Sequence, residues 1–164
     1  MNLTSPMKPE PHTSSSKPSR SAVSSHGVAR QPDDFVPAAQ VRALLANSLA
    51  GRQERLAAAD MISTDAAAAL VQTSRVTINS WISKGRAIGL NQSKRGLKLP
   101  RWQFEPALWE ALPKISAAMG VTEGWALLAF LETPHGALRG TAPRQAIEQG
   151  QVDRVIALAQ GEGH

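Results

Sequence analysis

The sequence of 164 residues contains no cysteine and no tyrosine, and its aromatic residues are three phenylalanines and four tryptophans. Without cysteine, the chain cannot form disulfides, thiolate metal sites or cysteine nucleophiles. With so few aromatic residues, aliphatic side chains and alanine must form the core, and the alanine clusters favour helices. No run approaches the roughly 18 apolar residues of a membrane span, and the chain does not begin with a secretory signal. We therefore expect a mainly helical, soluble, cytoplasmic protein that does not interact with membranes.

Acidic residues are absent from residues 66–104. This segment carries seven basic residues, whereas the rest of the chain carries 11 basic and 13 acidic ones. A solvated face normally mixes both signs, because a segment of one sign repels itself. A plain solvated face is the alternative, but a polyanionic partner is the simpler explanation. The charge distribution therefore favours nucleic acid as a partner.

The sequence also lacks motifs for catalysis and metal binding. Its four histidines, at positions 12, 26, 135 and 164, are scattered, and no two have the spacing of metal ligands. No P-loop, Gly-x-Ser-x-Gly or Gly-x-Gly-x-x-Gly motif occurs. His135 lies in a predicted turn rich in proline and glycine, where we expect a surface role. We predict no catalytic residue, no metal site and no cofactor, and we expect that the protein is not an enzyme.

We predict three parts: a disordered tail over 1–34, a DNA-binding domain over 35–118 and a small helical domain over 119–164. The tail contains eight serines and five prolines. It has too few large apolar side chains to offset the entropy of ordering, although a DNA-binding arm is an alternative. We predict that a helix begins near Asp33 and Asp34 and continues to about residue 59, with an apolar stripe formed by Val41, Leu45, Leu49 and Leu56. This stripe packs on the next domain or forms a dimer contact, and the sequence does not decide between them.

Two short helices are predicted inside the acid-free segment. Ser63 is the expected N-cap of an alanine-rich helix over 66–71, and Asp65 complements the dipole of its first turn. A tight turn follows, and Ser74 is the expected N-cap of a second helix over 75–84. Two short helices joined by a tight turn form the pattern of a helix-turn-helix, although an ordinary helical hairpin has the same pattern.

Small side chains are placed where these two helices would cross. We expect Ala67 and Ala68 to let the helices approach closely. We expect Leu70, Ile78 and Trp81 to fill the angle between them. The opposite side of the second helix is then free to face DNA.

The outward side chains of the second helix suit the major groove. Arg75 is a residue type that binds guanine O6 and N7, and Asn79 is one that binds adenine N6 and N7. Ser74, at the start of the helix, is placed for a phosphate contact. Two copies of the chain that read a palindrome are the usual arrangement for such proteins, so we expect a homodimer on double-stranded operator DNA.

A β-hairpin is predicted after the second helix, with strands over 86–90 and 97–100 around a basic turn that contains glycine. After a helix-turn-helix, such a hairpin would be a wing. Lys94 and Arg95 at its tip would then lie along the phosphate backbone. The complete set of expected DNA-binding residues is Ser74, Arg75, Val76, Asn79, Ser80, Lys84, Arg86, Lys94, Arg95 and Lys98.

The C-terminal part is predicted to contain four helices. The first begins at Glu105 and Pro106 and ends at Gly120, and the second has Thr122 as its expected N-cap. Thr141 is the expected N-cap of a short third helix, and the fourth covers 151–160. The four helices together span only about 60 residues, from Glu105 onward, which is few for a unit that is stable alone, so a partner or a dimer would help.

Residues 66–86 resemble the winged helix-turn-helix segment of excisionase and MerR-like proteins, with Gln72 at the place of the usual turn glycine. Leu99-Pro100-Arg101-Trp102-Gln103-Phe104 resembles the Tyr-Pro-x-x-Gln-Phe stretch of Xre/MbcA/ParS-type antitoxins. The stretch from Trp125 to Val155 is similar to the toxin-binding domain of the same antitoxins, whose pattern is Trp-Leu-x-x-Pro-x-x-x-Leu-x-Gly-x-x-Pro-x-x-x-Leu-x-x-Gly. The matching positions here include Pro134, Leu138, Gly140, Pro143 and Gly150. Together these resemblances cover about residues 66–160.

The resemblance implies an antitoxin of a type II toxin–antitoxin system, acting in the bacterial cytoplasm and at the nucleoid when bound to DNA. Such antitoxins pair with a RES-domain toxin that degrades NAD, cover the entrance of its active site, and repress their own operon with it. The positions implied for toxin binding are Gly150, Gln151, Arg154, Val155, Leu158, Gly161, Glu162, Gly163 and His164. The implied fold is mainly α, with a helix-turn-helix, a short β-hairpin wing and a small all-helical toxin-binding domain. The alternative is a stand-alone phage or plasmid regulator whose C-terminal domain dimerises.

Overall fold

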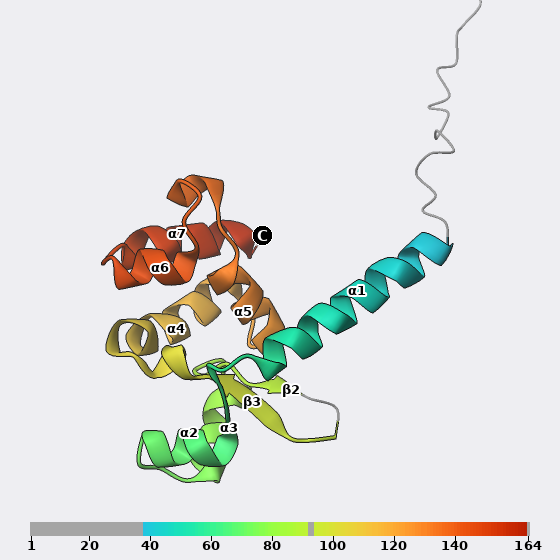
Figure 1. Cartoon of the computed structure of the whole chain (residues 1–164). Coiled ribbons are helices and arrows are strands. Elements are labelled where there is room, and N and C mark those ends of the chain that lie inside the picture. Colours follow the sequence, from blue (N-terminus) through green and yellow to red (C-terminus); the bar gives the residue numbers. More distant parts are fainter. Residues whose placement is uncertain (1–37, 92–93, 164) are drawn as a thin grey trace, which may run out of the picture. The chain divides into compact units, whose positions relative to one another are not determined.

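The computed structural model describes residues 38–91 and 94–163. These residues are mainly helical and contain a small antiparallel sheet (Figure 1). The prediction of a mainly helical protein is therefore confirmed. The predicted tail over 1–34 and the predicted helix start at Asp33 and Asp34 lie outside the described residues.

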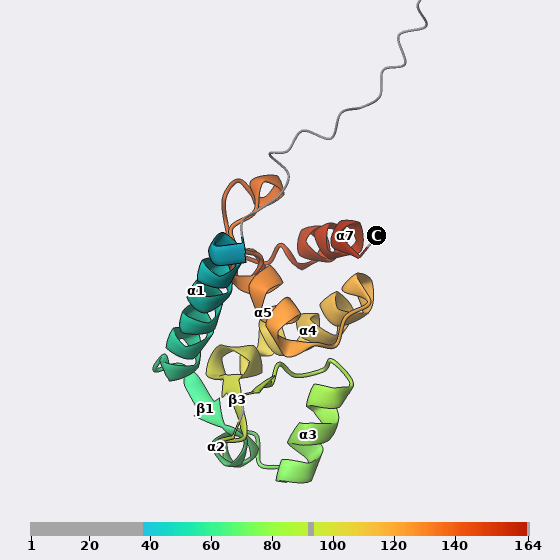
Figure 2. The same cartoon turned by 90° about the vertical axis from the view of Figure 1, so that its right-hand side faces the viewer.

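Short connections join the helices and strands along the chain. In order they are α1 (Ala38–Ala57), β1 (Met61–Ser63), α2 (Thr64–Leu70), α3 (Arg75–Ser83), β2 (Leu90–Asn91), β3 (Leu97–Pro100), the 3-10 helix η2 (Arg101–Phe104), α4 (Pro106–Met119), α5 (Gly124–Glu132), the 3-10 helix η3 (Gly136–Leu138), α6 (Pro143–Glu148) and α7 (Val152–Glu162). Helices α2 and α3 lie on one side of the sheet, and α4 to α7 lie on the other (Figures 1 and 2).

The sheet has the strand order β1-β3-β2, and both pairs are antiparallel. Met61 lies opposite Pro100, and Leu90 lies opposite Lys98. Strand β2 is shorter than the strand predicted over 86–90, and residues 86–89 form a loop. Strand β1 was not predicted, since three residues are too few to show the alternation that identifies a strand.

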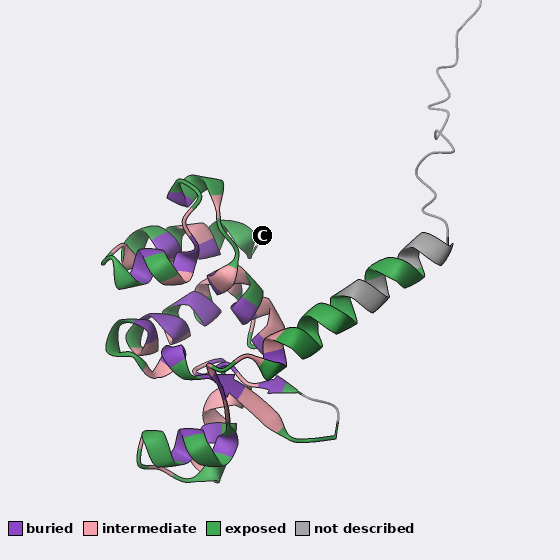
Figure 3. Ribbon diagram, in the orientation of Figure 1, coloured by how far each residue is buried: buried purple, intermediate pink, exposed green. Residues whose placement is uncertain are grey.

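A large apolar cluster surrounds α4, and residues of α1, β1, β2, η2 and α5 to α7 also belong to it. Leu108, Leu112 and Ile115 are its large buried residues at helical spacing on α4. Buried stretches of α4 are drawn in purple in Figure 3. Val155 and Ala159 of α7 pack against the same helix. The cluster therefore includes residues from both sides of the predicted domain boundary at 118–119, and that boundary stays a prediction.

A second, smaller cluster joins α2, α3 and β3, and it consists of Ala67, Ala68, Ile78 and Leu99. Both alanines are buried between the helices, as predicted. The prediction for Leu70 was wrong, because this side chain is 44% exposed. The inward stripe of α2 continues to Val71, which packs against the cluster, and Leu70 is about 100° away from that stripe around the helix.

Local hydrogen bonds determine where the helices begin. The hydroxyls of Ser63 and Ser74 accept from the backbone N–H groups of Ala66 and Thr77, so both predicted N-caps are confirmed. The N-cap of α5 is Glu123 instead of Thr122, and its carboxylate accepts from two backbone N–H groups at 3.0 and 2.7 Å. Helix α6 begins after Ala142 instead of Thr141, because Pro143 occupies its first position and needs no N–H partner there.

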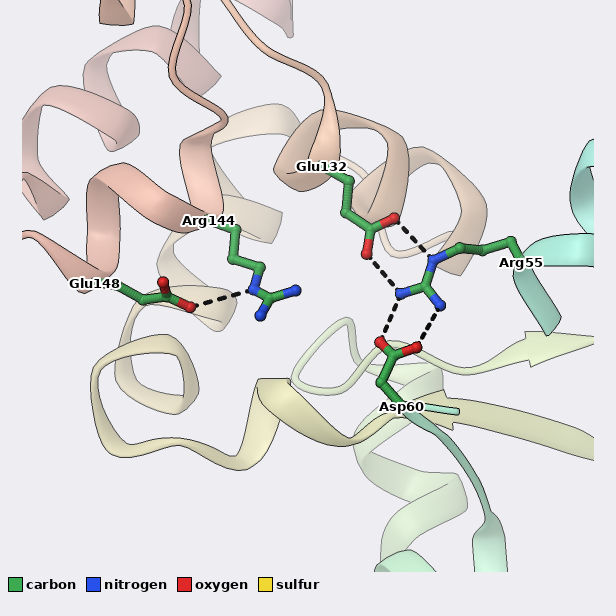
Figure 4. A network of polar contacts seen from close by, with 5 residues as sticks. All are labelled: Arg55, Asp60, Glu132, Arg144 and Glu148. Atoms are coloured by element: carbon green, nitrogen blue, oxygen red, sulfur yellow. Dashed lines mark hydrogen bonds and ion pairs between the residues drawn. The ribbon is translucent and has the colours of Figure 1, made fainter. Parts of the chain in front are cut away.

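Arg55, near the end of α1, binds two carboxylates, those of Asp60 and of Glu132 on α5 (Figure 4). Its guanidinium donates to both oxygens of Asp60 at 2.8 Å and to those of Glu132 at 2.6 and 2.9 Å. Hydrogen bonds with Glu132 raise the pKa of Arg55, against the opposing effect of burial and with further help from Asp60. The hydrogen bonds from Arg55 lower the pKa of Asp60 below its ordinary value. We define these three residues as the Arg55 clamp.

No single helix among the described residues is long and apolar enough to span a membrane. Helices α4 and α5 reach the required length and composition only as a pair, with a bend of 110° between them. Their apolar residues, among them Leu112, Ile115 and Leu128, belong to the core.

Candidate nucleic-acid interface

Helix α3 presents one side to the core and the other to solvent. Ile78 is fully buried, and Trp81 and Ile82 are half-buried against the smaller cluster. Because these positions face inward, Val76, Asn79 and Ser83 lie on the outer side and are exposed. We call this outer side, together with Arg75, the exposed α3 face.

The exposed α3 face combines side chains that can contact the edges of bases. Val76 is 78% exposed, more than the other exposed large apolar residues of the described chain. An apolar side chain can contact the methyl group of thymine, whereas arginine and asparagine can bind purines with two hydrogen bonds. Ser80, also expected to bind DNA, is half-buried beside this face, and Ser74 is exposed at its start.

The turn between α2 and α3 brings the two helices together. Gln72 has a φ of 57°, in the left-handed region that favours glycine. The backbone N–H of Thr73 donates to the carbonyl oxygen of Ala68 at 2.9 Å, which closes the turn. Gln72 thus adopts a conformation that glycine adopts most easily, and the turn keeps α2 packed against α3.

Further basic residues follow α3 along the chain. Lys84 is exposed at the end of α3, Lys94 and Arg95 are exposed before β3, and Lys98 is half-buried on β3.

Arg52 of α1 lies near these basic residues, although it was not among the DNA-binding candidates predicted from the sequence. Together with Lys94, Arg95 and Trp125 it lines a cavity of about 450 Å³, and its guanidinium lies 4.9 Å from the centre of the Trp125 ring. Arg52 lies outside the acid-free segment, so only the tertiary structure brings it to this place.

Arg86 differs from the other expected DNA-binding residues because it is half-buried among aromatic rings. Its guanidinium lies 4.5 Å from the centre of the Trp109 ring and 5.9 Å from that of Trp81. The two tryptophans meet edge to face at 5.0 Å, and Phe104 lies 5.4 Å from Trp109. Arg86 therefore helps to pack α3 against α4, and a contact with DNA stays a prediction for it.

Gln103 holds the loop that connects α3 to the sheet. Its side-chain oxygen accepts from the backbone N–H of Ile88 at 2.7 Å, and its side-chain nitrogen donates to the carbonyl oxygen of Ile88 at 3.0 Å. The amide is completely buried, so no water competes for these groups. At the start of the loop, Gly85 has a φ of 70° and lies so close to Ser116 that a β-carbon would collide with it. These contacts hold the loop between α3 and β2 against η2 and α4.

The residues implied for toxin binding differ in their exposure. Val155 is fully buried against α4, so its side chain is not available to a partner in this fold. Arg154 donates to the carbonyl oxygen of Ala137 at 2.7 Å, and a carboxylate oxygen of Glu162 lies 3.5 Å from Nε2 of His135. The others are exposed or half-buried, apart from His164, which lies outside the described residues; they are Gly150, Gln151, Leu158, Gly161 and Gly163. The outer side of α7 is therefore accessible, whereas its inner side belongs to the core.

Another cavity, of about 770 Å³, is lined by charged and aromatic residues from several elements. They include Asp60, Arg101, Glu105 and Arg144, together with Trp102, and the Arg144 guanidinium lies 4.6 Å from the centre of the Trp102 ring. Arg144 also pairs with Glu148 at 3.2 Å (Figure 4). Within residues 38–91 and 94–163, no group of three or more histidine, aspartate or glutamate side chains is placed to hold a metal ion.

The described residues thus bring together an exposed helix face, basic residues on and before strand β3, and a buried amide that holds the loop between α3 and β2. Among the described residues, Asp65 is the only acid that pairs with the exposed α3 face, and its carboxylate lies 3.2 Å from Nε of Arg75. Compared with protein-family models, with curated proteins and with solved structures, the chain has no significant match in any of the three.

Proposed function

We propose that the protein binds double-stranded DNA, with α2 and α3 as a helix-turn-helix and the β2–β3 hairpin as a wing. The observation that carries this proposal is the exposed α3 face, which lies within a segment of 39 residues without an acid. Such a segment attracts phosphates, and such a face has the hydrogen-bonding and apolar groups that read bases. Attraction and sequence reading then come from neighbouring parts of one surface.

In this proposal α3 enters the major groove, which is wide enough for a helix. Arg75 and Asn79 contact purines, Val76 contacts a thymine methyl group, and Ser74 donates to a phosphate oxygen. Lys94 and Arg95 lie along the backbone of the adjacent DNA strand. Lys84 and Lys98 add positive charge between these two contacts.

Two copies of the chain would read a palindrome, with the half-sites about one helical turn apart. Leu44 and Leu49 of α1 are 60% and 61% exposed, which supports α1 as a candidate dimer contact. Leu56, at the other end of the predicted stripe, is buried in the core, so this part of the stripe packs on the chain itself.

Arg75→Ala and Asn79→Ala are expected to weaken binding to a selected duplex by about 1–3 kcal/mol each and to relax the preference for one sequence. Lys94→Ala is expected to weaken binding to every duplex and to reduce the salt slope by about one. Fluorescence anisotropy at several salt concentrations measures both effects, with duplexes selected from a random library. Lys114→Ala, an exposed change on α4, is the matched control. Equal losses on selected and random duplexes with Arg75→Ala would mean that α3 does not read bases.

We further propose that the protein is an antitoxin that blocks a RES-type, NAD-degrading toxin and represses its own operon. The support is the pattern from Pro100 to Gly150 in the sequence, and the accessible outer side of α7 leaves room for such a partner. The alternative is a stand-alone winged helix-turn-helix regulator whose C-terminal part serves dimerisation.

Capture of the tagged full-length protein from its host, after nuclease treatment, is expected to retain one stoichiometric small protein with NAD-degrading activity. Adding this chain should abolish that activity. Because Leu158 and Ala159 belong to the core, truncation should begin at Gly161, and it is expected to impair inhibition while DNA binding persists. Full inhibition by the truncated chain would exclude residues 161–164 as the blocking element. If the chain is recovered alone, the stand-alone regulator becomes the better proposal.

A further inference from the structure

Asp65 lies in the first turn of α2 and is the last acid before the acid-free segment. Its Oδ1 atom is 3.2 Å from Nε of Arg75, the first residue of α3. Both side chains are about two-thirds exposed, at 69% and 66%. An acid thus contacts the one arginine of the exposed α3 face.

Neither stability nor attraction to DNA explains this contact. An exposed ion pair contributes little to stability, because water screens it and two long side chains must be held in place. A carboxylate near the phosphates also weakens the attraction of the surrounding basic residues to DNA. Asp65 interacts favourably with the α2 dipole, but that interaction does not require Arg75.

The geometry of the guanidinium suggests a different role. Arginine presents five N–H donors in one plane, and guanine accepts two hydrogen bonds from it at O6 and N7. When a carboxylate holds the Nε side, both terminal Nη groups remain for the base. Within the described residues these Nη groups form no hydrogen bond. A side chain held in its binding orientation also loses less freedom when it binds.

We propose that Asp65 is a positioning residue that holds the guanidinium of Arg75 for recognition of a guanine by two hydrogen bonds. This inference rests on the proposed binding of DNA through α3. It assigns a guanine to each half-site at the position that faces the start of α3. It also predicts that removal of an acid weakens binding to the correct sequence, contrary to simple electrostatics.

The test compares the full-length wild type with Asp65→Ala, Asp65→Asn and Glu105→Gln. Glu105 is the exposed acid at the other end of the acid-free segment and serves as the charge-matched control. Each protein is titrated with a duplex selected by the wild type, with a scrambled duplex, and with selected duplexes in which one guanine is replaced by 7-deazaguanine. This replacement removes the N7 acceptor and keeps the base pair.

For the wild type, 7-deazaguanine at one position per half-site is expected to weaken binding about tenfold. Asp65→Ala is expected to lose about tenfold on the selected duplex, to keep or gain affinity on the scrambled one, and to become insensitive to that replacement. Asp65→Asn, which keeps an oxygen acceptor without its charge, should lie between the two. Glu105→Gln should strengthen binding to both duplexes equally and keep the full sensitivity to 7-deazaguanine.

The proposal is overturned if Asp65→Ala behaves like Glu105→Gln, with equal gains on both duplexes and an unchanged 7-deazaguanine effect. A general loss on both duplexes, accompanied by a lower melting temperature of both Asp65 variants, also overturns it, because Asp65 would then act through folding. If the wild type itself binds neither duplex, the proposed function fails. That result is distinct from a failure of the role of Asp65.

Discussion

Gln103→Leu is expected to lower the free energy of unfolding by about 2–5 kcal/mol, because it leaves two buried backbone groups of Ile88 without partners. Leucine has a similar volume, so the loss comes from the missing hydrogen bonds rather than from a cavity. The amide is completely buried, and water cannot replace it without opening the structure. Urea unfolding monitored by circular dichroism and by tryptophan fluorescence measures the difference.

Gln145→Leu is the matched control for this change, because Gln145 is exposed on α6. We expect its effect to stay within about 0.5 kcal/mol of the wild type. If Gln103→Leu is equally mild, the amide does not hold the loop at Ile88.

Gln103→Glu separates the two hydrogen bonds of the amide. A carboxylate still accepts from the N–H of Ile88, but it repels the carbonyl oxygen of Ile88 unless it is protonated. Burial favours the protonated form, so the pKa of this glutamate is raised in the folded state. Its stabilising contribution is then present at low pH and lost as the pH rises. The deficit of this variant relative to the wild type should therefore be smaller at pH 4.5 than at pH 7.5.

Arg55→Ala is expected to lower the free energy of unfolding by about 2 kcal/mol, because it leaves two partly buried carboxylates without their shared cation. Arg55 is 21% exposed, and Asp60 and Glu132 are 36% and 29% exposed, so water screens part of the loss. The same change removes the ionic link of α1 to α5. Chemical unfolding measures the stability, and hydrogen exchange of the backbone of α1 measures the link.

The effect of Arg55→Ala on the free energy of unfolding is expected to depend on pH. The pKa of Asp60 is lowered in the folded state, so its stabilising contribution is present above the ordinary value of 3.8 and is lost as the pH falls. The wild type should therefore lose more stability on acidification to pH 3 than Arg55→Ala does. Arg55→Lys keeps the charge but not the planar fork, and it should recover only part of the stability. Parallel pH curves for the wild type and Arg55→Ala would exclude the Arg55 clamp as a source of stability.

Several helix boundaries were predictable because a short stretch of chain determines them. Ser63 and Ser74 cap α2 and α3 through bonds to N–H groups three residues ahead, as predicted. At α5 and α6 the prediction chose a threonine one residue too early. There the carboxylate of Glu123 and the ring of Pro143 determine the first turn instead. Neighbouring candidates for a cap differ by small energies, so the pattern places such a boundary only to within a residue or two.

The expected DNA-binding residues show what a sequence pattern can miss. The absence of acids from residues 66–104 drew attention to α3 and to four basic residues as DNA-binding candidates. These four are Lys84, Lys94, Arg95 and Lys98. The absence of acids also selected Arg86, whose aromatic neighbour Trp109 lies on another helix. It could not select Arg52, which reaches the same region from α1. Val155 was selected by its place in a family pattern, and its burial depends on the packing of α7 on α4.

The sequence by itself determined that the chain is mainly helical, where most helices begin and end to within a residue or two, and that its positive charge is concentrated in one quarter of its length. These properties depend on composition and on hydrogen bonds between residues a few positions apart, so the order of amino acids is enough to predict them. The tertiary structure alone decided strand β1, the Arg55 clamp, the hydrogen bonds of Gln103 with Ile88 and the contact of Asp65 with Arg75. Each of these depends on how separate segments of the chain pack against one another, which local hydrogen bonds do not determine.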